Sequence, residues 1–143
     1  MTPDQKTFLT RRLRAASKGQ PELMRLKTLL LRFGGKFLVA PPKPDSDVRA
    51  LLESGFLISG AISLKRMKRS SCHQNVSQLW RERRHGIIGI ATGYALTDDG
   101  LWRQHSWGLR RDGVLETTEP RAKYFGIILQ GEKADQFADS NPP

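Results

Sequence analysis

The sequence contains a single cysteine, Cys72, among 143 residues. One cysteine excludes an internal disulfide, which fits a reducing compartment and leaves the thiol free for other chemistry. Long apolar runs are also missing, because "TLLLRFGGKFLVA" is interrupted by Arg32 and Lys36 and "FLISGAISL" is too short to cross a bilayer. The N-terminus lacks the apolar centre of a secretory signal. These absences predict a cytoplasmic protein, although export by a dedicated secretion system would leave no such mark.

Histidine is scarce as well, with three residues in the chain. Cys72, His73, His85 and His105 match none of the usual zinc-ligand spacings. We therefore expect neither a metal site nor another cofactor.

What is present is an ordinary globular composition, with 38% hydrophobic and 27% charged residues. A chain of this length forms one domain and buries roughly two-thirds of the surface of its unfolded form. We expect a single domain over 1–143, with a basic helical part at 1–70, a helix and sheet at 71–130 and a polar tail at 131–143.

The net charge of +10 is concentrated in the first half of the chain. Residues 1–70 carry 15 Lys and Arg against 5 Asp and Glu, whereas residues 71–143 carry 9 of each kind. The basic clusters are "RRLR" at 11–14, "KRMKR" at 65–69 and "RERR" at 81–84. Such a surface attracts nucleic acid, anionic lipid or an acidic protein, or is simply a solvated face.

Helix signals dominate the N-terminal half. Thr2 and Pro3 begin a predicted helix over 3–17, and Pro21 begins a second helix that ends at the "GG" of 34–35. After the "PPKP" loop at 41–44, a short third helix runs through Leu52. The stretch "FLISGAISL" fits either a strand or an irregular buried segment.

A fourth helix is predicted over 72–84, and short runs rich in aromatic and branched residues follow it. "GIIGIATGYAL", "LWRQHSWGL", "VLETT" and "AKYFGIIL" are separated by the turn signals "TDDG" and "RRDG". This pattern indicates an antiparallel meander. Helices followed by strands predict an α+β fold in which N-terminal helices pack on a C-terminal antiparallel sheet.

Cys72 falls at the start of the fourth helix, because Ser70 and Ser71 are good N-cap residues. Cys72, Val76, Leu79 and Trp80 share one helix face, so the sulfur is expected to point toward the domain. Free backbone N–H groups and the helix dipole at this end favour a thiolate. The same groups stabilise an oxyanion formed by thiolate attack. Read alone, however, a lone cysteine is more often a small buried hydrophobe.

His105 shares a face of its predicted strand with Trp107, and the hairpin register decides whether an acid reaches it. A four-residue loop over 109–112 places Glu116 directly opposite His105. A two-residue turn at Asp112 and Gly113 places Glu116 opposite Leu109 instead, roughly 13 Å from His105. Local turn preferences favour the second register.

The order of these pieces resembles the papain-like thiol enzymes, and specifically their transglutaminase-like branch. The matching segments are "CHQN" at 72–75, "GYAL" at 93–96, "HSW" at 105–107, "ETT" at 116–118 and "YFG" at 124–126. They are similar to small bacterial domains that carry these pieces in this order, whereas residues 1–70 match no family pattern.

The resemblance implies a papain-like core with the nucleophile at a helix N-terminus. Cys72 would then be the nucleophile, His105 the general base and Glu116 the residue that orients the imidazole. The family more often has Asp or Asn at the third position. His73, Gln74 and Asn75 are candidates for support of the oxyanion.

These residues predict a cysteine hydrolase or acyltransferase that acts on an amide or acyl bond of a peptide-like substrate through a thioester. Peptidase, deamidase and transglutaminase chemistry share that intermediate and stay open. The basic patch of Lys65, Arg66, Lys68 and Arg69 abuts Cys72, so we expect it to lower the thiol pKa and attract an acidic substrate.

The alternative is a basic module that binds nucleic acid or protein on an inactive fold. Against nucleic-acid binding, Trp80, Trp102 and Trp107 fall at core-like positions and not on an exposed stacking surface.

Overall fold

A computed structural model describes all residues, 1–143, as an α+β fold of five helices and one mostly antiparallel, seven-stranded sheet. The helices are α1 (Pro3–Gly19), α2 (Glu22–Leu31), α3 (Val48–Ser54), α4 (Cys72–Glu82) and α5 (Glu132–Ser140). The strands are β1 (Phe37–Leu38), β2 (Phe56–Leu57), β3 (Ala61–Leu64), β4 (Gly89–Leu96), β5 (Leu101–Arg110), β6 (Gly113–Glu116) and β7 (Lys123–Leu129). No helix combines the length and the apolarity that a membrane crossing requires.

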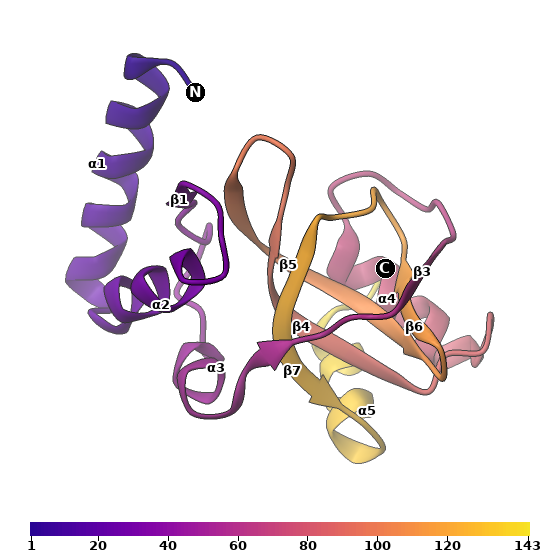
Figure 1. The fold of residues 1–143 in the computed structure, drawn as a ribbon. Helices are drawn as coiled ribbons and strands as arrows, with labels where there is room; N and C mark the ends of the chain where they lie inside the picture. The colour runs from indigo at the N-terminus through magenta and orange to yellow at the C-terminus, as the bar shows by residue number, and fades with distance from the viewer.

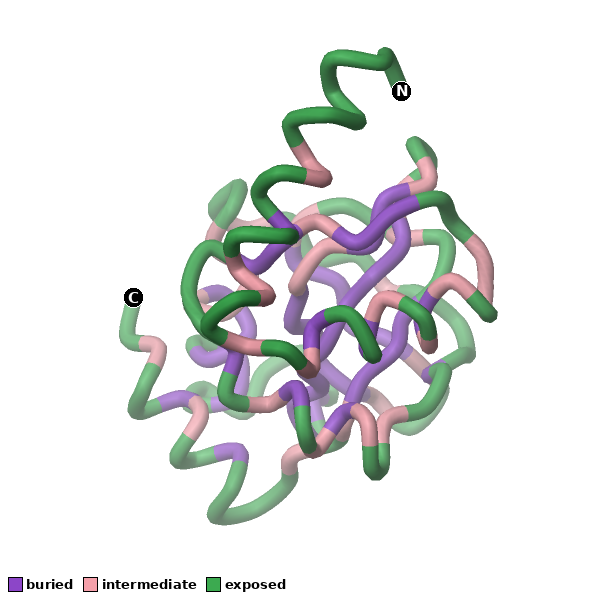
Figure 2. Tube along the Cα trace, turned by 90° about the vertical axis from the view of Figure 1, so that its left-hand side faces the viewer, coloured by how far each residue is buried: buried purple, intermediate pink, exposed green.

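The four predicted helices are present. A capping box of Thr2 and Gln5 begins α1, which projects from the body with most of its surface exposed (Figures 1 and 2). The apolar face of α2, with Leu23, Leu26 and Leu30, packs with α3 against one end of the sheet. The N-terminal helices therefore pack on the sheet, as the order of the sequence patterns predicts.

The predicted meander is wrong in one connection. Strands β4, β5 and β6 pair in order, but β7 returns to the free edge of β4, giving the order β7-β4-β5-β6 of a Greek key. The segment 117–122 makes this crossover. It carries Thr118 and Arg121 past β5, where both residues line a cleft.

The undecided stretch "FLISGAISL" forms β2 and β3, which are the two ends of the main strand path. Only residues 58–60 join them, and four Cα steps span at most about 14 Å. The sheet must therefore curl until its ends approach each other, and in Figure 1 the chain from β2 to β3 crosses in front of it. The curled inner face holds a buried cluster of Ile58, Ala91, Ala95, Trp107, Leu109, Val114 and Tyr124.

The polar tail at 131–143 contains a helix, α5, over most of its length. Ala134 and Ala138 are buried and pack against Val76 and Trp80 of α4. The Trp80 indole N–H also donates to Asp135, at 2.8 Å. The i, i+4 spacing of the two alanines was the signal for this helix.

Candidate active site

Cys72 is the first residue of α4 and Ser71 is one of the two predicted N-cap residues, but the expected side-chain cap is missing. Ser71 is the N-cap residue and its hydroxyl makes no capping hydrogen bond. The N–H groups of the first turn therefore lack side-chain partners from the cap. Ser70 has a positive φ of 56°, a strained backbone for serine, where the chain turns into the helix.

The loop before Cys72 is anchored on both sides. The N–H groups of Lys65 and Met67 donate to the carbonyls of Glu116 and Thr117, each at 2.8 Å. On the other side, the Asn75 amide donates to the carbonyl of Lys68 at 2.7 Å. Asn75, a predicted oxyanion residue, thus fixes the loop and does not reach into the cleft.

His105 and Glu116 form a buried pair. His105 Nε2 lies 2.9 Å from Glu116 Oε1 and 3.1 Å from Oε2. The His105 ring stacks on Trp107, with 5.8 Å between the ring centroids. The imidazole is therefore fixed in position and orientation.

Neither predicted register of the β5-β6 hairpin is correct. Arg110 pairs with Gly113 and Gly108 with Leu115, so the turn is Arg111–Asp112. Glu116 is the next residue and stands level with Trp107, diagonally across from His105. Diagonal neighbours on one face have Cα atoms about 7–8 Å apart, within reach of a long side chain. The extra methylene of Glu, compared with Asp, allows the contact.

The carboxylate of Glu116 accepts several hydrogen bonds besides the one to His105. The N–H of Thr117 and the N–H and hydroxyl of Thr118 donate to Oε2, and the Tyr124 hydroxyl donates to Oε1 at 2.9 Å. Burial raises the pKa of Glu116, but the interactions with His105 and these donors outweigh it and lower the pKa overall. Glu116 is a buried carboxylate held in its charged form.

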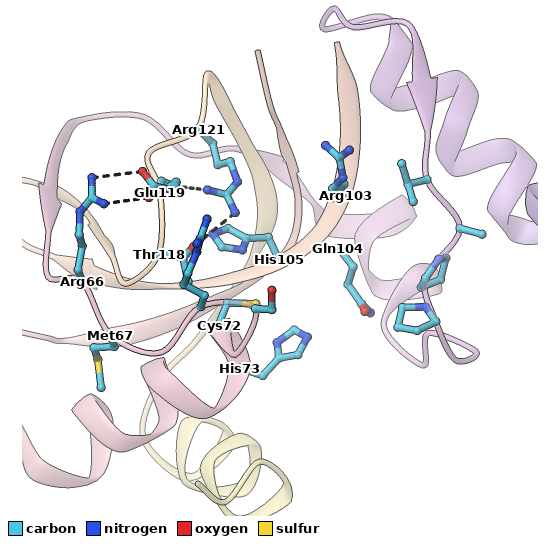
Figure 3. A pocket seen from close by; sticks show the side chains of 16 residues that line it. Arg66, Met67, Cys72, His73, Arg103, Gln104, His105, Thr118, Glu119 and Arg121 are labelled. Atoms are coloured by element: carbon cyan, nitrogen blue, oxygen red, sulfur yellow. Dashed lines mark hydrogen bonds and ion pairs between the residues drawn. The ribbon is translucent and has the colours of Figure 1, made fainter. Parts of the chain in front are cut away.

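Cys72 and His105 lie next to each other in the lining of one cleft (Figure 3). Burial raises the pKa of Cys72, but hydrogen bonding with His105, the charge of that ring and the Ser106 backbone N–H outweigh burial, so the pKa is lowered. Conversely, burial lowers the pKa of His105, but Cys72 and Glu116 raise it overall. Both shifts favour a thiolate beside an imidazolium, and Nδ1 is the ring nitrogen that Glu116 leaves free for the thiol.

His73 points away from the thiol, as adjacent helical positions require. Its Nδ1 lies 2.5 Å from the Ser106 hydroxyl, which in turn lies 2.9 Å from the hydroxyl of Thr92. Burial and the charge of His105 lower the pKa of His73. His73 therefore lines the site as a neutral side chain.

A cleft of about 880 Å³ opens over Cys72 and His105. One wall is the apolar segment 39–42 before α3, and the other combines the loop 66–70 with Thr118, Glu119 and Arg121 of the crossover. Gln104, Arg103 and His73 complete the lining (Figure 3). Cys72 belongs to this lining, so the thiol faces the cleft.

Only some of the predicted supporting and basic residues line the cleft. Gln74 is half-buried and does not line the cleft, whereas Gln104, which sequence reasoning missed, lines it beside His105. Of the basic patch, Arg66 and Arg69 line the cleft, and Lys65 and Lys68 are exposed outside it. The position of Gln104 next to His105 was the only sequence signal for it.

No group of three or more His, Cys, Asp or Glu side chains is placed to hold a metal ion. The chain matches no protein-family model, no curated protein and no solved structure.

Proposed function

We propose that the protein is a thiol-dependent hydrolase or acyltransferase with a papain-like core. The observation that supports this most directly is the arrangement of Cys72, His105 and Glu116 at one end of the cleft. The thiol lies at a helix N-terminus, its pKa is lowered by His105, and His105 Nε2 lies 2.9 Å from a buried carboxylate. A packing role for the cysteine requires none of these features.

In the proposed reaction, the Cys72 thiolate attacks the carbonyl carbon of an amide or other acyl group. A C–S bond forms, and the carbonyl electron pair moves to oxygen. The free N–H groups at the start of α4 and the amide of Gln104 are the donors available to that oxyanion. The tetrahedral intermediate collapses when the C–N or C–O bond breaks, and the imidazolium of His105 gives its proton to the leaving group.

The thioester is then resolved by water or by an amine. As His105 takes a proton from the nucleophile, a new C–O or C–N bond forms at the acyl carbon. The resulting tetrahedral intermediate collapses when the C–S bond breaks, which releases the product and regenerates the thiolate. Glu116 stabilises the imidazolium in both steps and holds the ring in position. Water gives hydrolysis or deamidation, and an amine gives transfer.

The direct test is to trap the acyl-enzyme. The protein is incubated with an activated neutral ester such as p-nitrophenyl acetate, quenched in acid and analysed by mass spectrometry. We expect one added acetyl group, mapped to Cys72 and absent from Cys72→Ala. His105→Ala should form it at least about 100-fold more slowly. Acylation that is equally fast in His105→Ala would contradict the proposal.

A second candidate is nucleic-acid binding, which the exposed basic side chains of α1 favour. The helix has one acidic residue, Asp4, and its exposed cations are Lys6, Arg11, Arg12, Arg14 and Lys18. Such binding would weaken steeply between low and moderate salt and would survive in Cys72→Ala. Trp80, Trp102 and Trp107 are buried, as predicted, so stacking of bases on these rings does not contribute.

A further inference from the structure

Four arginines line the cleft, and two of them have no acidic partner. Arg66 pairs with Glu119 at 3.0 Å, and Arg103 pairs with Asp99 at 3.1 Å. Arg69 and Arg121 form no ion pair. Since Glu119 is the only carboxylate of the cleft lining, the wall beside the thiol carries uncompensated positive charge.

Arg121 is held in place without being neutralised. Its guanidinium donates to the backbone carbonyl of Glu119 and, at 3.4 Å, to the hydroxyl of Thr118. These contacts use part of the five-donor fork and leave other N–H groups for an anion. In Figure 3, Arg121 extends above Thr118 and His105. A carboxylate bound there would lie beside the reacting atoms.

The backbone of β5 offers a second set of unused groups. Polar groups of successive residues in a strand point to alternate edges. The carbonyl of Leu101 accepts from Thr97 on the β4 side, whereas the carbonyl of Trp102 accepts from Val39 on the β1 side. By this alternation, the N–H and C=O of Gln104 point away from β4.

No strand of the protein pairs with Gln104 at that edge. The pairing of β1 with β5 ends at Trp102, and the pairing with β6 begins only at Gly108. The gap between them opens into the cleft, which Gln104 lines. An extended peptide can add to a free edge of this kind through main-chain hydrogen bonds.

We infer that the cleft binds an acidic peptide, which pairs with the free β5 edge at Gln104 and places a carboxylate side chain against Arg69 and Arg121. The apolar wall at 39–42 lies on the other side of the bound chain. The inference rests on the proposed function in taking this peptide as the substrate of Cys72. The tests measure alkylation and peptide binding, and neither requires turnover. The inference and the proposed function can therefore fail separately.

The first test compares a charged and a neutral alkylating probe at the only thiol. Iodoacetate and iodoacetamide both form a C–S bond at Cys72 and release iodide, but only iodoacetate carries a carboxylate. Dividing the iodoacetate rate by the iodoacetamide rate removes differences in thiolate reactivity. We expect this ratio to be about tenfold or more above that of the unfolded chain and to fall as salt is added.

The variants Arg69→Gln and Arg121→Gln should each lower the ratio several-fold, and the double variant should bring it near the unfolded value. Arg14→Gln, which removes the same charge from the exposed face of α1, is the matched control and should leave the ratio unchanged. An unchanged ratio in the double variant would overturn the arginine site. A high ratio that Arg14→Gln lowers equally would assign the effect to net charge and would also overturn it.

The second test measures peptide binding to Cys72→Ala, which cannot turn over substrate. Two extended peptides that differ only by Glu or Gln at one central position are compared by fluorescence anisotropy. We expect the Glu peptide to bind about tenfold more tightly, and Arg69→Gln with Arg121→Gln to abolish the difference. Equal affinities would overturn the inference, as would stronger competition by a polynucleotide than by the acidic peptide.

The proposed function and the binding of an acidic peptide can each fail without the other. If Cys72 forms no acyl-enzyme but the Glu peptide binds through the two arginines, the proposed function fails and the binding site stands. If the acyl-enzyme forms and the peptides bind equally, the proposed function stands and the acidic specificity fails.

Discussion

Glu116 reaches His105 along a diagonal of the β5-β6 hairpin. The hairpin register places Glu116 level with Trp107, yet its Oε1 lies 2.9 Å from His105 Nε2. The longer Glu side chain spans the offset of two residues. The structure thereby gives a physical reason for Glu at a position where the resemblance suggests Asp or Asn.

This geometry predicts opposite kinds of failure for two variants of Glu116. In Glu116→Asp the charge remains but the carboxylate no longer reaches the ring, and in Glu116→Gln the reach remains but the charge is lost. We expect both to slow acylation of Cys72, with Glu116→Gln slower by about 10²- to 10⁴-fold. Acylation rates with p-nitrophenyl acetate check this. A rate in Glu116→Asp equal to that of the wild type would contradict the role of side-chain length.

The lowered pKa of Glu116 predicts a loss of stability in acid. A carboxyl group whose pKa is lower in the folded state stabilises the fold above its ordinary pKa of about 4.3. This contribution is lost as the pH falls through the folded-state pKa. Urea unfolding at pH 7, 5, 4 and 3 should show this loss in the wild type.

Two variants identify which carboxyl group causes this loss of stability in acid. The stability of Glu116→Gln should be lower at pH 7 and vary less between pH 5 and 3. Asp99→Asn is the control, because Asp99 is exposed and solvent screens the interactions that lower its pKa, so they contribute little to stability. Its stability profile should follow that of the wild type closely. Parallel profiles for Glu116→Gln and the wild type would refute the assignment.

The sequence predicted the local features of this site better than their assembly. The start of α4 at Cys72 followed from Ser71, and the turn signals located β4 to β7. Both predicted registers failed because the Asp112–Gly113 turn signal does not separate a turn at these two residues from the observed turn at Arg111–Asp112. The pairing of β7 with β4 is non-local, so no pattern within one segment encodes it.

Other features depend on contacts that have no signature along the chain. Gln104 of β5 and Arg121 line the same cleft because the crossover at 117–122 brings Arg121 back to β5. Asn75 looked free to act in the site because its contact with the carbonyl of Lys68 depends on the loop before α4. Contacts with residues distant in the sequence determine whether a polar residue supports the site or takes part in its chemistry.

Tyr124 supports the site through one hydroxyl group. Tyr124→Phe removes a donor to Glu116 while keeping the ring that packs on Trp107, with 4.9 Å between centroids. We expect a loss of about 1–3 kcal/mol in the free energy of unfolding and slower alkylation of Cys72. Tyr94→Phe is the matched control, since its buried hydroxyl donates to Asp45 at 2.9 Å and makes no hydrogen bond with Cys72, His105 or Glu116. Similar losses of stability with slower alkylation in both variants would exclude a specific role for Tyr124.

Gly126 provides the space that the Trp107 ring occupies. A Cβ at Gly126 would lie 2.9 Å from Trp107 Cη2 and 2.6 Å from the carbonyl oxygen of Thr92. Gly126→Ala should therefore destabilise the protein by about 1–3 kcal/mol through overpacking. Gly19→Ala, whose Cβ meets nothing within 4 Å, is the control and should be neutral or slightly stabilising. Thermal unfolding of both variants checks the prediction, and an undiminished stability of Gly126→Ala would count against tight packing around His105.

The most direct test of the central claim is the rate of iodoacetamide alkylation of Cys72 as a function of pH, in the wild type and in His105→Ala. Because the pKa of Cys72 is lowered mainly by His105, the wild-type rate should rise with an apparent pKa well below about 8.5. In His105→Ala the apparent pKa should move up toward the ordinary value, since burial is then opposed by the Ser106 N–H but no longer by His105. A thiol that titrates normally in the wild type, or identically in both proteins, would contradict an activated Cys72.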